Sequence, residues 1–399
     1  MLIVQKYGGT SVGTLERIEN VAARVIETKK SGADVVVVVS AMSGVTNQLV
    51  DYASHYTKDP DGVAMDMLLS SGERVTCALL TIALIKLGYP AVGLSGRLAG
   101  IITDSVHTKA RIEAIDTKRM KEELKAGKIV VVAGFQGIDE KGDVTTLGRG
   151  GSDLSAVAIA GALDADLCEI YTDVDGVYTT DPRIEPKAKK LDKISYDEML
   201  ELASLGAKVL QNRSVELAKK LNVNLVTRSS FNHNEGTLIT KEESMEAVLV
   251  SGIALDKNQA RVTLRGVVDK PGIAAEIFTA LAEKNINVDM IIQNVGQDGT
   301  TNLGFTIPQN ELHIAKECMD KLSASREILY NDEIVKVSVV GVGMKSHTGV
   351  ASLAFQTLAN EGINIQMIST SEIKISMIVD QKYGELAVRA LHEAYKLDK

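Results

Sequence analysis

The chain has 399 residues, of which 45% are hydrophobic, 24% are charged and 4% are aromatic, and its formal net charge is −8. This composition indicates a globular protein of two or three domains and excludes a disordered chain. The negative charge and the lack of Trp argue against binding to nucleic acid or to an anionic membrane surface. The sequence has no apolar run that approaches the roughly 20 residues of a membrane helix.

Two further features predict the cellular compartment. Cys77, Cys168 and Cys318 are far apart in the sequence and do not form a disulfide pattern, which is typical of a reducing environment. The sequence enters a predicted strand at Leu2, so we expect no signal peptide. We therefore expect a cytoplasmic protein.

Residues 1–240 alternate between predicted strands and helices. The run DVVVVVS is typical of a strand that is buried on both faces of a parallel sheet. Such alternation predicts a mainly parallel, three-layer α/β domain, whose ligands bind at the carboxyl ends of the strands. The predicted strands are Leu2–Tyr7, Asp34–Ser40, Ala91–Leu94, Ile129–Phe135, Leu167–Thr172 and Asn224–Arg228; the predicted helices are Thr14–Lys30, Met65–Leu87, one beginning near Asp153, and most of Leu200–Leu221.

Two glycine-rich turns follow predicted strands and precede helices. VQKYGGTS contains Lys6, and VTTLGRGGSD contains Arg149 and ends where Ser152 or Asp153 is expected to cap a helix. Glycine allows backbone N–H groups to approach an anion, and a helix N-terminus adds partial positive charge. Although a tight turn or a flexible surface loop would have similar composition, a lysine in an apolar strand is costly unless its charge has a function. The pair of turns predicts a phosphotransferase, but Thr14-Leu15 excludes an ordinary P-loop.

Other polar residues are weaker candidates. Glu73 lies in SSGERV on a predicted helix, where a solvated glutamate is the alternative. Asp173 ends a strand, where turn formation is the alternative. The six histidines are scattered without metal-ligand spacing, so we predict no protein metal site.

The C-terminal part contains a repeat. After a polar stretch at 231–245, which we interpret as a linker, PGIAAEIFTALAEKNINVDMI matches TGVASLAFQTLANEGINIQMI with an offset of 77 residues, so that Gly272 matches Gly349. Each copy predicts a small α+β module without clustered catalytic side chains. A regulatory ligand-binding role is favoured over dimerisation alone.

These motifs together resemble those of aspartokinases, and the resemblance covers essentially the whole chain. VQKYGGTSV, SAMSGVTN, SSGERV, TLGRGGSD, YTDVDGVYTTDPR, GAKVLQNRSVELA, DKPG and STSEIKIS follow in the family's order. The resemblance implies a three-layer, mainly parallel amino-acid-kinase domain followed by two α+β ferredoxin-like ACT domains. The implied boundaries are 1–240 for the kinase domain, 241–260 for the linker and first regulatory strand, 261–330 for the first ACT domain and 331–399 for the second.

The resemblance also implies the reaction and its residues. ATP, with Mg²⁺ bound through its phosphates, would phosphorylate the β-carboxylate of L-aspartate in the synthesis of lysine, threonine and methionine. The implied catalytic residues are Lys6, Asp153 and Arg149, and the implied aspartate-binding residues are Ser40, Thr46, Glu73, Phe135, Arg149, Gly150, Gly151 and Ser152. The implied nucleotide-binding residues are Lys6, Tyr7, Gly8, Gly9, Thr172, Asp173, Tyr178, Arg183 and Lys208.

Regulation by lysine, threonine or both is implied for the ACT domains. The implied effector-binding residues are Asp269, Ile273, Ala274, Asn287, Asp289, Gln293, Asn364 and Ile365. The sequence after Gln293 lacks the serines often found in the family, which leaves the identity of the effector open. A homo-oligomer through the ACT domains is expected, and Met245 stands where some members begin a separate regulatory chain.

Three other interpretations of the sequence are open. Glutamate 5-kinase, carbamate kinase and a nucleotide monophosphate kinase are related possibilities, against which the paired ACT modules and Glu73 argue. An amino-acid sensor with an inactive kinase domain is disfavoured because Lys6, Glu73, Arg149 and Asp153 are all present. A dinucleotide oxidoreductase is disfavoured because no GxGxxG follows the first strand.

Overall fold

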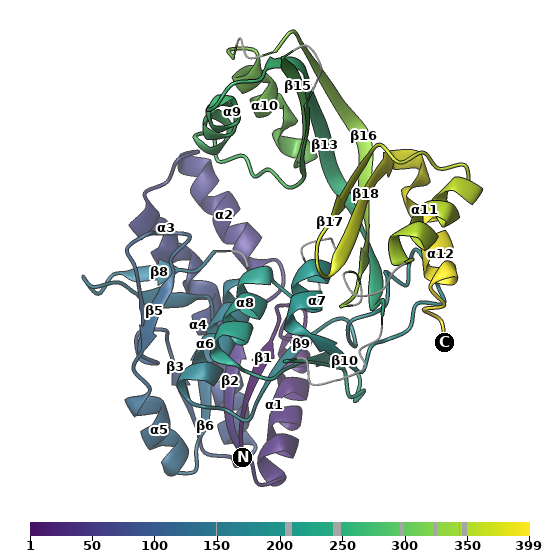
Figure 1. The fold of residues 1–399 in the computed structure, drawn as a ribbon. Coiled ribbons are helices and arrows are strands. Elements are labelled where there is room, and N and C mark those ends of the chain that lie inside the picture. The colour runs from purple at the N-terminus through teal and green to yellow at the C-terminus, as the bar shows by residue number, and fades with distance from the viewer. Residues whose placement is uncertain are drawn as a thin grey trace. The chain divides into compact units, whose positions relative to one another are not determined.

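The computed structural model describes residues 1–148, 150–203, 210–241, 249–295, 299–322, 325–342, 344 and 349–399. The chain forms two compact units (Figure 1). The first comprises Met1–Val177, Lys190–Ala203 and the described part of 208–243. The second comprises Tyr178–Lys189 and the described part of 244–399, so a segment that the sequence analysis assigns to the first domain belongs to the second unit.

The main sheet of the first unit has eight strands in the order β10-β12-β11-β9-β1-β2-β6-β3. Neighbouring strands are parallel except β11 and β12, which confirms the mainly parallel α/β prediction. The strands are β1 (Leu2–Tyr7), β2 (Asp34–Val39), β3 (Ala91–Leu94), β6 (Ile129–Ala133), β9 (Leu167–Thr172), β10 (Lys193–Ser195), β11 (Leu225–Ser229) and β12 (Thr237–Thr240).

Helices cover both faces of this sheet. On one face, α1 (Leu15–Lys30) and α4 (Ser71–Lys86) pack their apolar side chains against alternate residues of β1 and β2, including Tyr7. On the other face, α6 (Gly151–Ala162) lies against β1, β2 and β9, and α8 (Asn212–Leu221) packs on α6. Because successive strand residues point to opposite faces, Lys6 points toward α6 while Tyr7 points toward α1 and α4.

Local sequence explains α1. Thr14 is its N-cap, and the Thr14 hydroxyl accepts a hydrogen bond from the Arg17 N–H. Glu16 in the first turn and two lysines in the last turn complement the helix dipole. Its buried residues recur with helical spacing, so the predicted helix is confirmed.

A second, four-stranded sheet was not predicted. Its order is β5-β4-β7-β8, with β4 (Ile101–Thr103), β5 (Ile112–Ile115), β7 (Gln136–Ile138) and β8 (Val144–Thr146). β7 and β8 form an antiparallel hairpin that follows β6 and leads into α6. The remaining helices of the unit are α2 (Val45–Tyr56), α3 (Gly62–Leu69), α5 (Lys118–Lys125) and α7 (Tyr196–Leu202).

The stretch predicted to be helical, Met65–Leu87, is helical over nearly its whole length, but it is interrupted at Ser70, where α3 ends and α4 begins. The Ser70 carbonyl accepts a hydrogen bond from the Gln136 side chain at 3.0 Å, and the Ser71 hydroxyl donates to the Leu68 carbonyl. These contacts compete with the regular helical pattern. Together α3 and α4 are long and apolar enough to span a membrane, a test that buried core helices also pass. Their buried Asp66 and Glu73 have hydrogen-bond partners inside the protein.

Other boundaries also differ from the predictions. Within the helix predicted over Leu200–Leu221, the structure has α8 and the end of α7, which starts earlier, at Tyr196. Residues 204–209 lie outside the described part. The stretch interpreted as a linker contains β12, which pairs with β11 as part of the main sheet. The α6 helix begins at Gly151 with Gly150 at its N-cap and without a side-chain cap, so capping by Ser152 or Asp153 is wrong.

The second unit contains one six-stranded sheet, in the order β14-β15-β13-β16-β18-β17. Its strands are β13 (Gly252–Val268), β14 (Ile291–Val295), β15 (Thr300–Ile307), β16 (Glu327–Val340), β17 (Met367–Thr370) and β18 (Lys374–Asp380). The helices are α9 (Ile273–Ala282), α10 (Leu312–Met319), α11 (Val350–Asn360) and α12 (Gly384–Ala394), with short 3-10 turns η2 (Gln309–Glu311) and η3 (Gln381–Tyr383).

The repeat corresponds to two modules that share the long strands β13 and β16. The first half of β13 pairs with the second half of β16, and each half-pair has its own hydrophobic core. Gly272 and Gly349 have φ angles of 96° and 100° at the N-caps of α9 and α11. The prediction of two paired α+β modules is therefore confirmed.

Candidate functional site

The loops predicted to bind ligands meet at the carboxyl ends of the central strands. The Ser40 N–H donates to the Tyr7 carbonyl, the Gly134 N–H donates to the Val39 carbonyl, and the Gly8 N–H donates to the Tyr171 carbonyl. These bonds join the ends of β1, β2, β6 and β9 side by side. Residues that are far apart in the sequence therefore meet at the carboxyl end of the sheet, where ligands bind in an open α/β sheet.

Lys6 and Asp153 form an ion pair at this edge. Lys6 Nζ lies 2.6 Å from Asp153 Oδ1, and both side chains are largely buried. Lys6 comes from β1 and Asp153 from the first turn of α6. A Cβ added at Gly8 would lie 3.4 Å from Lys6 Nζ, so the ammonium group lies beside the glycine turn. The ammonium, paired with the Asp153 carboxylate, and the glycine turn therefore lie together at one corner of the site.

Gly9 brings two loops into close contact. A Cβ at Gly9 would lie 2.9 Å from the Ala41 carbonyl oxygen, and the Ser43 N–H donates to the Gly9 carbonyl. Any larger residue at Gly9 would push the two loops apart. Ser40 is half-buried beside this contact, and Thr46 is half-buried in the first turn of α2.

Glu73 is a buried carboxylate in the first turn of α4. Its Oε1 accepts a hydrogen bond from the Ala41 N–H at 3.1 Å, and among the described residues its Oε2 has no hydrogen-bond partner. Burial raises the pKa of Glu73 to about 7, although the Ala41 N–H partly opposes this shift. A buried carboxylate with one unpaired oxygen is suited to binding a ligand cation.

The second glycine-rich loop leads into α6. Gly150 has a φ angle of 73°, and the Gln211 side chain lies against it, so a Cβ there would meet Gln211 atoms at 2.6 Å. Phe135 also has a positive φ angle, and its N–H donates to the Ser155 hydroxyl. Gly151 and Ser152 open the helix and are buried. Arg149 lies outside the described residues.

The end of β9 supplies two of the predicted nucleotide-binding residues, Thr172 and Asp173. The Thr172 hydroxyl donates to the Asp173 carboxylate, and the Ser230 N–H donates to the Thr172 carbonyl. The Ser11 hydroxyl in turn donates to the Ser230 hydroxyl at 2.8 Å. The sequence analysis missed Ser11 and Ser230, and it also missed Gln211. Ser11 could have been found, because it stands within a recognised motif. Ser230 could not, because its contact with Thr172 depends on which strands are neighbours in the sheet.

Three predicted nucleotide-binding residues lie outside the described part of the first unit. Tyr178 and Arg183 belong to the second unit, where the Arg183 guanidinium forms paired hydrogen bonds with Asp181. Lys208 lies outside the described residues. Their proposed roles stay predictions.

The predicted effector-binding residues all lie in the second unit. Asp269, Ile273 and Ala274 flank the start of α9, whereas Asn287, Asp289 and Gln293 lie in or before β14. Asn364 and Ile365 occupy the matching position before β17. The Asp289 carboxylate pairs with the buried ammonium of Lys336 on β16, and Asp256 lies 3.9 Å from that ammonium.

Comparison with known proteins agrees with this organisation. A model of the amino acid kinase family matches residues 1–228, and an ACT domain model matches residues 262–321 and 337–395. An aspartokinase of Helicobacter pylori (strain J99) is 62% identical over 405 residues, covering 100% of both proteins. Two crystal structures of E. coli aspartokinase III are each 26% identical to this chain. The complex with aspartate and ADP (R-state) has a TM-score of 0.82 and covers 99% of each chain. The complex with lysine and aspartate (T-state) has a TM-score of 0.78 and covers 98% of this chain and 99% of that one.

Proposed function

The chain belongs to the aspartokinase family and is a phosphotransferase, and we propose that it converts L-aspartate and ATP into 4-phospho-L-aspartate and ADP. The observation that carries this proposal is the position of three groups at one sheet edge. These are the Lys6–Asp153 ion pair, the Gly8–Gly9 turn and the buried Glu73 carboxylate with an unpaired oxygen. They provide an ammonium group and a glycine turn that can contact phosphates, and beside them a carboxylate that can bind an ammonium group.

We assign the aspartate amino group to Glu73. The Oε2 atom, which has no hydrogen-bond partner in the described part of the chain, would accept a hydrogen bond from the ammonium. This bond would also favour the ionised carboxylate. Arg149 would bind the α-carboxylate as a bidentate pair. Ser40, Thr46, Phe135 and Ser152, together with the Gly150–Gly151 backbone, would line the rest of this pocket.

The proposed reaction needs no strong general base, because the β-carboxylate of aspartate is already ionised at neutral pH. One of its oxygens attacks the γ-phosphorus, and the bond from this phosphorus to the β,γ-bridging oxygen breaks, leaving ADP. Lys6 and the Gly9 N–H stabilise the charge on the transferring group, while the Gly8 N–H holds the turn against the Tyr171 carbonyl. Asp153 holds Lys6 in place. Mg²⁺ enters as part of the Mg–ATP substrate and neutralises charge on the phosphates.

The nucleotide would lie beside the end of β9. Thr172 and Asp173 present polar side chains there, close to Ser230 and Ser11. Tyr178, Arg183 and Lys208 would complete the nucleotide site by resemblance to the family. A solved relative that binds ADP supports a nucleotide in this fold.

We also propose feedback inhibition by lysine, threonine or both at the second unit. The ACT modules and the lysine complex of a solved relative support this role. The edge strands β14 and β17 expose Ile291 and Ile368, which suits association with a second copy through these modules. A separate regulatory chain starting near Met245 stays a proposal. So does location in the reducing cytoplasm, where Cys77, Cys168 and Cys318 would remain free thiols.

The proposed function is tested by measuring ATP-dependent formation of aspartyl hydroxamate in the presence of Mg²⁺, with and without added lysine and threonine. Formation of hydroxamate that either amino acid suppresses would support both proposals. Activity without suppression would support the kinase reaction and refute this regulation. Activity with glutamate or carbamate but not with aspartate would overturn the proposed substrate.

A further inference from the structure

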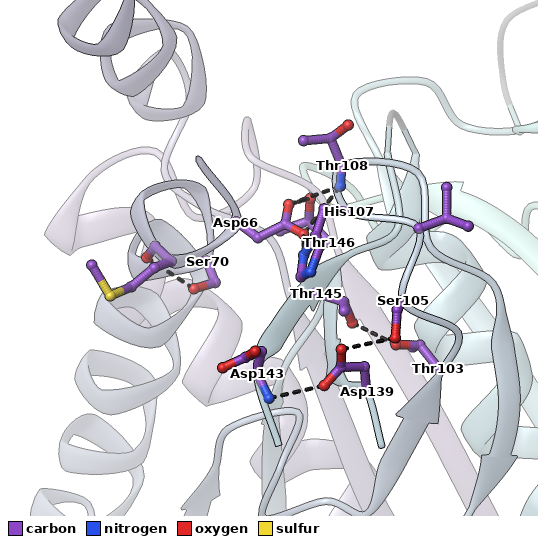
Figure 2. A network of polar contacts seen from close by, with 12 residues as sticks. Asp66, Ser70, Thr103, Ser105, His107, Thr108, Asp139, Asp143, Thr145 and Thr146 are labelled. Carbon is purple, nitrogen blue, oxygen red and sulfur yellow. Dashed lines mark hydrogen bonds and ion pairs between the residues drawn. The ribbon is translucent and has the colours of Figure 1, made fainter. Parts of the chain in front are cut away.

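The buried carboxylate of Asp66, which the proposed mechanism does not use, contacts the end of β8, just before the second glycine-rich loop. Asp66, on α3, is fully buried and accepts hydrogen bonds from three residues (Figure 2). Its Oδ1 accepts from the Thr146 hydroxyl at 2.5 Å and from the Thr108 N–H at 3.0 Å. Its Oδ2 lies 2.8 Å from His107 Nδ1 and also 3.0 Å from the Thr108 nitrogen.

These contacts join three separate segments: α3, the turn at residues 105–110 and the end of β8. Thr108 has a φ angle of 66°, a conformation that is uncommon for a threonine and that must be held by its surroundings. A Cβ at Gly62 would lie 2.8 Å from His107 Cβ, so Gly62 allows α3 to approach this turn closely. The network is therefore built into the packing of the three segments.

The position of Thr146 connects the network to the site. Thr146 is the last residue of β8, and the loop that contains Arg149 follows directly. The Thr146 carbonyl accepts from the Ala110 N–H, and the Leu147 carbonyl accepts from Arg213. The Leu147 N–H donates to the carbonyl of Phe135. Asp66 accepts the hydrogen bond that holds the Thr146 side chain at the point where this loop begins.

We propose that Asp66 is a positioning residue for aspartate, acting through Thr146 on the loop between β8 and α6. This inference rests on the proposed function, because the loop is assigned to the aspartate carboxylate. A displacement of about 1 Å in a binding group can reduce kcat/KM on the order of 100-fold. Loss of the Asp66 contacts would therefore weaken the use of aspartate while leaving the ATP corner at Lys6 and Gly8 in place.

The chain contains a matched control for this test. Asp139 is also a buried aspartate, and it accepts hydrogen bonds from the Ser105 hydroxyl and the Asp143 N–H (Figure 2). It also accepts one from the Lys141 N–H. It lies at the turn between β7 and β8, at the opposite end of β8 from Thr146. Asp139→Asn thus perturbs the same hairpin and the Ser105 end of the 105–110 turn, but it removes no contact to Thr146.

The experiment compares Asp66→Asn, Thr146→Val, Thr146→Ser and Asp139→Asn in the full chain, with KM values for aspartate and ATP measured separately. Asp66→Asn and Thr146→Val are expected to lower kcat/KM for aspartate by about 10- to 100-fold, without a matching change in the KM for ATP. Thr146→Ser retains the hydroxyl and is expected to behave like the wild type. Because Asp66 and Thr146 act together, a variant that carries both Asp66→Asn and Thr146→Val should lose less kcat/KM than the product of the two single losses.

A purely structural role predicts a different pattern. Asp66→Asn would then lower the melting temperature, as expected for Asp139→Asn, with an unchanged aspartate KM, and this result would overturn the proposal. Equal increases in both KM values would also overturn it. Amide hydrogen exchange of peptides spanning 144–155 tests the anchor without substrate, and faster exchange is expected in Asp66→Asn but not in Asp139→Asn. If the wild type does not phosphorylate aspartate, the proposed function fails, and this exchange measurement still decides whether Asp66 holds the loop.

Discussion

Glu73→Gln gives the sharpest test of the site, because it should stabilise the protein and weaken aspartate binding together. Burial raises the pKa of Glu73 from 4.5 to about 7, so the folded protein binds its proton more tightly than the unfolded chain does. Stability therefore falls as the pH rises from about 4.5 to about 7. At about 1.4 kcal/mol per pKa unit, the ionised carboxylate destabilises the ligand-free protein by about 3 kcal/mol above pH 7.

Glutamine has nearly the same shape and stays neutral at every pH. The Glu73→Gln variant should accordingly unfold at a higher temperature than the wild type at pH 8, and this advantage should shrink at pH 5, where the wild-type carboxyl is largely protonated. Thermal unfolding of both proteins without aspartate, at the two pH values, measures the difference. Ser71→Ala serves as a control on the same helix turn, because Ser71 is not ionisable and its change should give no pH-dependent difference.

The same substitution should impair function. Loss of a charge-assisted hydrogen bond costs about 1.5–3 kcal/mol, so the KM for aspartate should rise roughly 10- to 100-fold. In the wild type, the KM for aspartate should rise as the pH falls below about 7, since the ammonium requires the ionised carboxylate. A melting-temperature difference that is the same at pH 5 and pH 8 would refute the reasoning about burial. An unchanged aspartate KM in the variant would refute the assignment of Glu73 to the substrate.

Three further predictions concern other parts of the molecule. Lys6→Met should reduce kcat by about 100- to 1000-fold with the fold retained by circular dichroism, because it removes the cation beside the phosphates, and near-normal turnover would exclude this role. Gly9→Ala should reduce kcat/KM about 10-fold, because its Cβ would lie 2.9 Å from the Ala41 carbonyl oxygen and separate the two loops; wild-type kinetics would contradict this packing argument. Lys336→Met should weaken inhibition by lysine or threonine about 10-fold, because Asp289 loses its buried partner, and identical dose–response curves would show that this ion pair has no part in effector binding.

Much of the fold could be predicted because its local signals are strong. The strand β2 was predicted correctly, since its five consecutive buried valines suit only a strand covered on both faces. The break at Ser70 could not be predicted, because it depends on a side chain from Gln136, which is 66 residues away. The four-stranded sheet was missed because three of its strands have only three residues and carry little periodic signal.

The candidate site divides in the same way. Lys6, Glu73 and Asp153 could be named from the sequence because each stands in a recognisable motif. Asp66 could not, since it is one acidic residue in an apolar helix, and its partners are 41, 42 and 80 residues away. In the sequence, His107 was only one of six scattered histidines, and its contact with Asp66 became visible only once α3 and the 105–110 turn were placed together.

By itself the sequence determined the family, the order of the modules and the chemical types available for catalysis, because these follow from motifs and from short-range patterns along the chain. Only the tertiary structure decided which of these groups meet. Lys6 reaches Asp153 because β1 lies against α6. The two repeats share β13 and β16 because the first half of β13 pairs with the second half of β16. Such pairings depend on which surfaces bury each other most effectively across long separations, and no local segment carries that information.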